Sequence, residues 1–214
     1  MKKLAIFDFD GTLFDSVDDV VKSFNEALTV YGFPTVTREE YIGSLGGNID
    51  EIVSLVLKDN ATPENLESFK NAYLKIYYGS KKENSIPFPG VYEILKELES
   101  RDVILTINSN RFTDSIEFFV EKFFGDVDFL SIEGHDFDIP TKPSPAGVNR
   151  IIEKAGVSAG DAIFIGDSLT DIETAKNAGV DCLIVKWGYG NEKDFENDYV
   201  LEAIDDVSEI LNYF

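Results

Sequence analysis

Short apolar runs alternate with longer amphipathic stretches along most of this 214-residue chain. The runs are rich in β-branched or aromatic residues and are bounded by turn formers, which is typical of buried parallel strands. Five such strands are expected: Leu4–Phe7, Val103–Ile107, Phe129–Ile132, Ala162–Ile165 and Cys182–Val185. Apolar residues between them recur at helical spacing. Alternating strands and helices predict an α/β fold with a Rossmann-like, doubly wound parallel sheet.

Helix boundaries can be predicted within this alternating part. Val91, Ile94, Leu95 and Leu98 follow the breaker Pro89-Gly90 at the spacing of one helical face. The other expected helices start at Ser144-Pro145 and stop at Gly156, run over Thr170–Asn177, and end the chain with Val207, Ile210 and Leu211.

The stretch from Ser16 to Ile86 breaks the alternation, because its pattern is helical and contains no good strand. Thr37 to Glu40 forms a capping-box pattern, and Thr62-Pro63 starts another helix. About 70 residues are enough to form a small core. We therefore expect a catalytic core made of residues 1–15 and 87–214, and a helical cap domain made of residues 16–86.

Composition and charge narrow the classes of partner. Lys and Arg number 19 against 40 Asp and Glu, so the formal charge is 19 − 40 = −21. Phosphate backbones repel such a surface, which excludes nucleic acid as a general partner. No apolar run approaches the ~20 residues that span a bilayer, and Asp8 and Asp10 interrupt the N-terminal run too early for a signal peptide. We expect a cytoplasmic protein, monomeric or homodimeric, with no membrane partner.

Acidic residues follow two of the predicted strands. Asp8 and Asp10 come after the first strand, and Asp167 and Asp171 come after the fourth. Ligands of open α/β sheets bind beyond the carboxyl ends of the strands. Two close carboxylates repel, so one must take a proton or a cation must lie between them. Oxygen ligands in this position suit Mg²⁺.

Each acidic group also has a structural interpretation. Asp8 and Asp10 fit a strand-to-helix loop with an Asx turn. Asp167 fits the cap of the following helix, with Asp171 in its first turn.

Two further segments carry groups suited to phosphate oxygens. Ser109, Asn110 and Arg111 follow the second strand, near an expected helix start. Lys142 lies between Thr141 and Pro143, also close to a helix start. Taken singly, Lys142 fits a surface lysine and Ser109 fits a helix cap.

Together the four segments resemble the signature motifs of the haloacid dehalogenase superfamily of phosphohydrolases, in the order that this superfamily uses. The motifs are Asp8-x-Asp10-Gly11-Thr12, Ser109 with Asn110, Lys142, and Gly166-Asp167-Ser168-x-x-Asp171. The helical insert matches the cap of the family. Pro89-Gly90-Val91 and Lys142-Pro143-x-Pro145 are similar to the phosphoglycolate phosphatase-like branch.

This resemblance implies a mechanism. Asp8 would attack phosphorus to form an aspartyl-phosphate, and Asp10 would act as general acid and then general base. Mg²⁺ would be held by Asp8, the backbone carbonyl of Asp10 and Asp167, with Asp171 supporting them. Ser109, the Asn110 backbone and Lys142 would hold the transferring oxygens.

The substrate implied is a small phosphorylated metabolite such as phosphoglycolate, a nucleoside monophosphate or a sugar phosphate. The expected substrate-facing cap loop, residues 41–48, has neither lysine nor arginine. This disfavours Schiff-base phosphonate hydrolysis and the grip on a second phosphate that a mutase needs. Tyr41, Gly43, Leu45 and Arg111 are candidate substrate contacts. Two alternatives stay open: a phosphomutase of the β-phosphoglucomutase type, and a regulatory phospho-accepting module.

Overall fold

The computed structural model describes residues 1–136 and 139–214, and the chain divides into two compact units. The first unit combines Met1–Phe14 with Pro87–Phe214, and the second is Asp15–Ile86. Two short strands, β2 (Phe14–Asp15) and β3 (Ile86–Pro87), pair where the chain passes between the units.

The first unit is built on a six-stranded parallel sheet with the order β5-β4-β1-β6-β7-β8. Its strands are β1 (Leu4–Phe7), β4 (Ile104–Phe112), β5 (Phe129–His135), β6 (Ala162–Gly166), β7 (Asp181–Val185) and β8 (Val200–Ile204). Phe7 pairs with Ile107 of β4 and with Ile165 of β6. The segments that follow these three strands therefore start side by side at one edge of the sheet.

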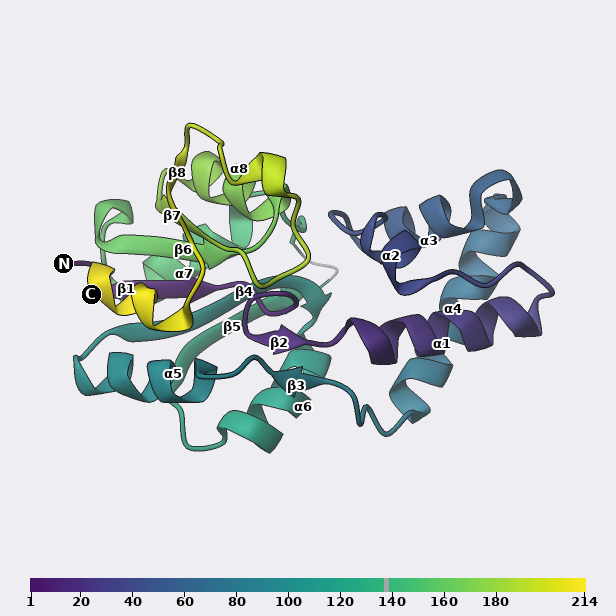
Figure 1. Cartoon of the computed structure of the whole chain (residues 1–214), viewed down its shortest axis with the longest axis horizontal. Coiled ribbons are helices and arrows are strands. Elements are labelled where there is room, and N and C mark those ends of the chain that lie inside the picture. The colour runs from purple at the N-terminus through teal and green to yellow at the C-terminus, as the bar shows by residue number, and fades with distance from the viewer. Residues whose placement is uncertain (137–138) are drawn as a thin grey trace. The chain divides into compact units, whose positions relative to one another are not determined.

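Helices cover both faces of this sheet, so the predicted α/β class is confirmed (Figure 1). One face packs on α5 (Val91–Ser100) and α6 (Thr113–Phe124), and the other on α7 (Ala146–Ala155) and α8 (Leu169–Ala178). Side chains alternate along a strand, so Ala5 and Phe7 join the first core, and Leu4 and Ile6 join the second. Burial on both faces explains why β1 is apolar at every position.

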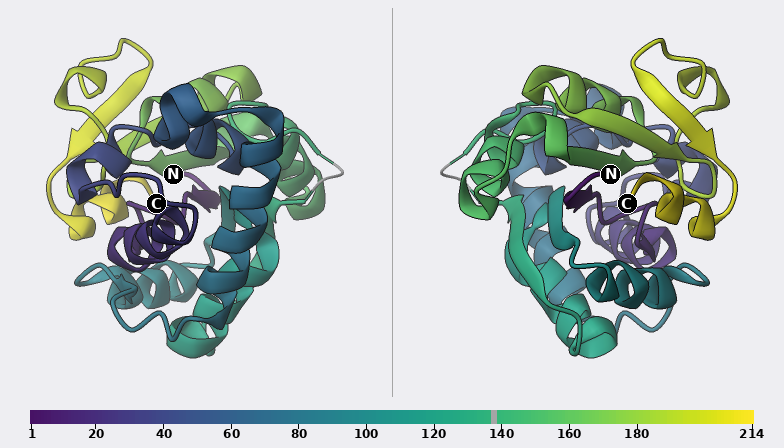
Figure 2. Two further views of the ribbon diagram at one scale, coloured as in Figure 1. Left: turned by 90° about the vertical axis from the view of Figure 1, so that its right-hand side faces the viewer. Right: turned by 90° about the vertical axis from the view of Figure 1, so that its left-hand side faces the viewer.

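The described residues of the first unit also include the 3₁₀ turns η2 (Ala159–Asp161), η3 (Glu192–Asp194) and η4 (Val207–Tyr213). The expected C-terminal helix is thus 3₁₀, and it still buries Ile210. The two chain termini lie side by side (Figure 2), where the Lys2 N–H donates to the Tyr213 carbonyl at 3.0 Å.

The second unit is helical among its described residues. It contains α1 (Val17–Val30), α2 (Arg38–Ile42), α3 (Ile49–Leu57), η1 (Lys58–Asn60) and α4 (Pro63–Gly79). Thr37 and Glu40 form the predicted capping box, and Thr62 caps α4. Aromatic rings form much of its core, with Phe24 centred 4.2 Å from Tyr73.

Three features differ from the sequence prediction. Strand β8 was not expected, and it is an edge strand that fully buries only Ile204. Helix α6 begins at Thr113 without a side-chain cap, so Ser109 is not its cap. Helix α7 begins at Ala146, so Pro145 rather than Ser144 occupies its N-cap position. Strand β8 is defined by its pairing with β7, which no local pattern in its sequence shows.

Candidate active site

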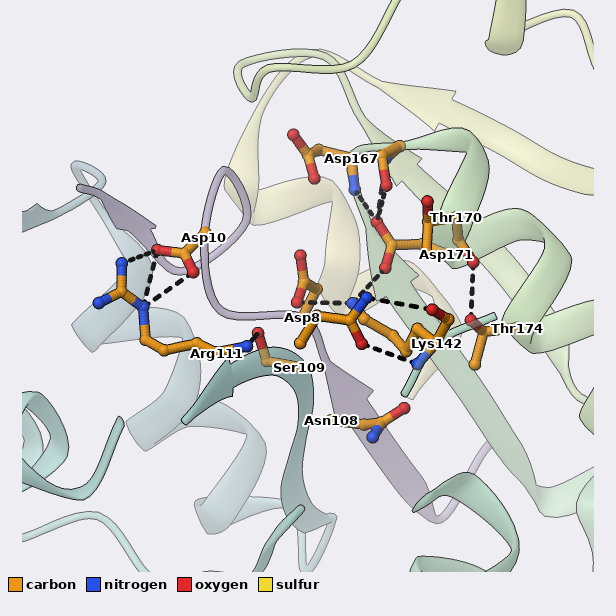
Figure 3. Close-up of polar contacts among 12 residues, drawn as sticks. Asp8, Asp10, Asn108, Ser109, Arg111, Lys142, Asp167, Thr170, Asp171 and Thr174 are labelled. Carbon is orange, nitrogen blue, oxygen red and sulfur yellow. Dashed lines mark hydrogen bonds and ion pairs between the residues drawn. The ribbon is translucent and has the colours of Figure 1, made fainter. Parts of the chain in front are cut away.

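Lys142 lies at the centre of the site, at the carboxyl edge of the sheet (Figure 3). Its Nζ is 2.7 Å from Asp8 Oδ1 and 2.6 Å from Asp171 Oδ1, so it bridges the two carboxylates. The side chains of Lys142, Asp8 and Asp171 are 5%, 9% and 0% exposed. Asp8 follows β1, Lys142 lies on the loop before α7, and Asp171 lies in the first turn of α8.

The pKa values of the buried groups Asp8, Asp167 and Lys142 are all shifted from their usual values. Burial raises the pKa of Asp8 to about 7, although Lys142 opposes this shift. Burial, Asp171 and Asp8 together raise the pKa of Asp167 well above its usual value. Burial disfavours the Lys142 ammonium, but Asp171 and Asp8 outweigh it and hold the pKa of Lys142 above its usual range. Lys142 therefore forms ion pairs with Asp8 and Asp171, and its positive charge also lowers the pKa of Asp167.

Asp8, Asp167 and Asp171 each offer an oxygen within 4.8 Å of the others, the one such acidic group found among the described residues. Asp171 already uses both oxygens: Oδ1 contacts Lys142, and Oδ2 accepts the Asp167 and Ser168 N–H groups at 3.1 and 3.0 Å. Ser168, not Asp167, is the N-cap of α8. Asp8 and Asp167 provide the carboxylate oxygens that Mg²⁺ prefers, and a cation would offset their repulsion. The residues present fit this ion.

A loop after β7 closes around Asp167. The Tyr189 N–H donates to Asp167 Oδ2 at 2.6 Å. A Cβ on Gly188 would lie 2.4 Å from the Asp167 Cβ, and one on Gly190 would lie 1.7 Å from the Asp167 carbonyl oxygen. A Cβ on Gly11, which has φ +82°, would lie 2.3 Å from Asp167 Oδ2. The two glycines around Tyr189, directly after a buried strand, are the sequence signal for this close approach.

Ser109 and Asn110 belong to the extended end of β4, and the helix expected near them, α6, begins at Thr113. Asn110 Nδ2 donates to the Lys142 carbonyl at 3.1 Å, and the Lys142 N–H donates to Asn110 Oδ1 at 2.7 Å. This reciprocal pair fixes the backbone of the lysine loop against β4. Ser109 is buried, and its Oγ accepts the Arg111 N–H at 3.3 Å.

Asp10 has a basic partner of its own. Arg111 Nη2 is 2.6 Å from Asp10 Oδ1, and Arg111 Nε is 2.8 Å from Asp10 Oδ2. Each of the two acids therefore has a basic side chain beside it. Lys142 balances Asp8 and Arg111 balances Asp10, because β4 and the lysine loop approach from different directions (Figure 3).

The three candidates in the second unit do not share one environment. Tyr41 is buried, with its ring 5.0 Å from Phe24. Gly43 is the exposed C-cap of α2, and Leu45 is half-buried. Substrate contact by these residues stays a prediction.

Residues 5–185 match the model of the haloacid dehalogenase-like hydrolases. The chain therefore belongs to this family, and the predicted family and enzyme class are confirmed. No helix in the described part of the chain is long and apolar enough to cross a membrane.

Individual relatives indicate which branch of the family the chain is most similar to. The chain is 31% identical to a phosphoglycolate phosphatase of Psychrobacter arcticus, over 99% of this chain and 95% of that protein. It is also 31% identical to the phosphoglycolate phosphatase of Pseudomonas syringae pv. tomato, over 99% of this chain and 79% of the relative. A solved structure assigned to haloacid dehalogenase-like hydrolases, from Bacteroides fragilis, is 26% identical, with a TM-score of 0.91 over 98% of this chain and 100% of that one.

Proposed function

We propose that this protein is a Mg²⁺-dependent phosphatase that hydrolyses a small phosphomonoester through an aspartyl-phosphate on Asp8. The observation that carries the proposal is the buried Asp8, 2.7 Å from the Lys142 ammonium and within 4.8 Å of oxygens from Asp167 and Asp171. Phosphoglycolate is the first substrate to test, because two relatives at 31% identity are phosphoglycolate phosphatases.

In the first step an Asp8 oxygen attacks phosphorus, and the bond from phosphorus to the leaving oxygen breaks. Asp10 gives that oxygen, as it leaves, the proton that it took from water in the preceding turnover. Lys142 and the Ser109 hydroxyl stabilise the charge on the transferring oxygens. Asn110 supports this step because its side chain fixes the lysine loop.

In the second step water attacks the phosphorus of the aspartyl-phosphate, and Asp10 takes the proton from this water. Inorganic phosphate leaves and the Asp8 carboxylate is restored. Splitting the reaction in this way replaces one difficult displacement with two easier ones.

Asp8, Asp167 and the Asp10 backbone carbonyl are the proposed Mg²⁺ ligands. When bound, the ion would supply positive charge that offsets the negative charge of the Asp8 carboxylate and of the phosphoryl oxygens. Asp171 positions the site without direct ligation, because its two oxygens hold Lys142 and the amides of Asp167 and Ser168.

We propose that residues 16–86 act as a cap that excludes bulk water during the reaction. The cytoplasmic location and the monomeric or dimeric state stay predictions.

Phosphate release from a panel of phosphomonoesters tests the proposal. The panel contains phosphoglycolate, a nucleoside monophosphate and a sugar phosphate, each with Mg²⁺ or EDTA. We expect Mg²⁺-dependent release by the wild type and none by Asp8→Asn. Isomerisation of a sugar phosphate without net release would instead show a mutase. Stable phosphorylation with slow release would show a regulatory module.

A further inference from the structure

We propose that Arg111 is a positioning residue that holds the Asp10 carboxylate for its proton transfers, and not a contact for the substrate. This inference rests on the proposed function, since it assigns Asp10 the proton that the leaving oxygen receives.

The contact between Arg111 and Asp10 is two-pronged. Arg111 Nη2 and Nε lie 2.6 and 3.1 Å from Asp10 Oδ1, and Nε also lies 2.8 Å from Oδ2. Both carboxylate oxygens are thus held by one planar fork, which fixes the rotation of the carboxylate as well as its position. The Asp10 side chain remains 30% exposed, so it is held without being sealed off.

Arg111 is itself held on its other sides. Its Nη1 donates to Ser115 Oγ at 3.1 Å. Its guanidinium lies 5.4 Å from the centre of the Phe9 ring and 5.7 Å from that of Phe119. The arginine side chain is only 8% exposed. A guanidinium packed in this way is a rigid support, and it is poorly placed to reach out for a ligand.

The backbone around Arg111 connects this support to the rest of the site. Its N–H donates to Ser109 Oγ, and the next residue back, Asn110, is clamped to the lysine loop. The end of β4 therefore sets the positions of Lys142 and Asp10 through adjacent residues. The end of β4 thus carries Arg111, which pairs with Asp10, and also holds the loop of Lys142, which pairs with Asp8.

Leaving groups differ in how much they need Asp10. The alkoxide released from phosphoglycolate is strongly basic and needs a proton as it leaves, whereas 2,4-dinitrophenolate leaves without one. Losing the position of Asp10 must therefore slow the first substrate much more than the second. Since kcat/KM covers the steps up to formation of the aspartyl-phosphate, it reports this difference without the later hydrolysis.

The experiment compares Arg111→Met with wild type on these two substrates, with Mg²⁺ present. We expect kcat/KM for phosphoglycolate to fall about 100-fold, through kcat, and that for 2,4-dinitrophenyl phosphate to change less than about fivefold. Asp10→Asn should reproduce this selectivity. Arg111→Lys should restore part of the phosphoglycolate activity, because a point charge replaces only part of the fork.

Arg150→Met is the matched control, because Arg150 is half exposed and its Nη1 lies 3.8 Å from Glu133 Oε2. It should leave both values unchanged. If Arg111→Met does not fold, Arg111→Lys keeps the charge and should show a smaller fall in kcat/KM that is again larger for phosphoglycolate than for 2,4-dinitrophenyl phosphate.

Equal losses on both substrates would overturn the inference. So would a rise in KM for phosphoglycolate at unchanged kcat, which would make Arg111 a substrate contact. Failure of the proposed function would look different, because the wild type would then hydrolyse neither substrate, or Asp8→Asn would hydrolyse both as well as the wild type does.

Discussion

Asp8 and Asp10 are two positions apart in the sequence, yet they lie in opposite environments. The Asp8 side chain is 9% exposed and shares Lys142 with Asp171. The Asp10 side chain is 30% exposed and pairs with the guanidinium of Arg111. The proposed nucleophile, Asp8, thus lies in a buried cluster in which one ammonium pairs with two carboxylates. The proposed acid-base residue, Asp10, is partly exposed, so water and a leaving group can reach it.

The two basic partners suit these environments. A lysine ammonium is a compact charge that can serve two carboxylates at once, whereas an arginine fork orients one carboxylate in a plane. Removing the ion pair between Asp8 and Lys142 should therefore affect folding, metal binding and catalysis together. Removing the ion pair between Asp10 and Arg111 should affect proton transfer selectively.

The largest expected effect is that of Asp8→Asn. An amide cannot form the aspartyl-phosphate, so phosphate release should fall at least about 1,000-fold. The measurement is steady-state release of phosphate from phosphoglycolate with Mg²⁺. Asp205→Asn, at a largely exposed carboxylate paired with Lys186, serves as the control and should keep full activity. Full activity of Asp8→Asn, in a preparation free of deamidation, would remove the distinction between the two aspartates.

Lys142→Met comes second and should destabilise the protein as well as slow it. Removing the ammonium leaves Asp8 and Asp171 buried without their cation, and breaking a buried pair costs about 3–5 kcal/mol. Denaturant unfolding measures this loss, and Lys186→Met provides an exposed lysine as control. Stability equal to that of wild type would show that Lys142 does not neutralise the cluster.

Asp167→Asn should weaken Mg²⁺ binding by at least about tenfold, since it removes one proposed ligand. The chain has one tryptophan, Trp187, whose indole N–H donates to the Thr12 carbonyl at 3.1 Å beside the site. Its fluorescence can follow a Mg²⁺ titration, with calorimetry as a second readout. An unchanged affinity would exclude Asp167 as a ligand.

The last prediction concerns the pH dependence of stability in EDTA. The pKa of Asp8 is 3.8 when unfolded and about 7 when folded, so the folded state holds the proton more tightly. The contribution of Asp8 to the free energy of unfolding is therefore most favourable below about pH 4 and declines as pH rises to about 7. Asp8→Asn should gain stability relative to wild type across this window. A difference that does not vary with pH would contradict the raised pKa of Asp8.

Much of the first unit could be predicted from sequence because its chemistry follows strong local patterns. The run Leu4–Phe7 is buried on both faces, and acids directly after such a strand must lie at the edge of the sheet. The resemblance to a known family then gave Lys142 its place beside Asp8. The partner of Asp10 could not be predicted in this way, because Arg111 is 101 residues away and reaches it only through the extended end of β4.

Features that depend on long-range packing were missed for the same reason. Strand β8 has an exposed edge pattern and is defined by its pairing with β7. The sequence pattern of the loop around Tyr189 marks a close backbone approach, but the acceptor of the Tyr189 N–H, Asp167 Oδ2, is known only from the structure.

The most direct test of the central claim is to trap the phosphorylated protein. Wild-type protein is mixed with phosphoglycolate and Mg²⁺, quenched in acid during the first turnover, and analysed by intact and peptide mass spectrometry. We predict a transient species heavier by one phosphoryl group, carried by the peptide that contains Asp8 and absent from Asp8→Asn. A phosphoryl group on another residue such as Ser109, or its persistence in Asp8→Asn, would contradict the account.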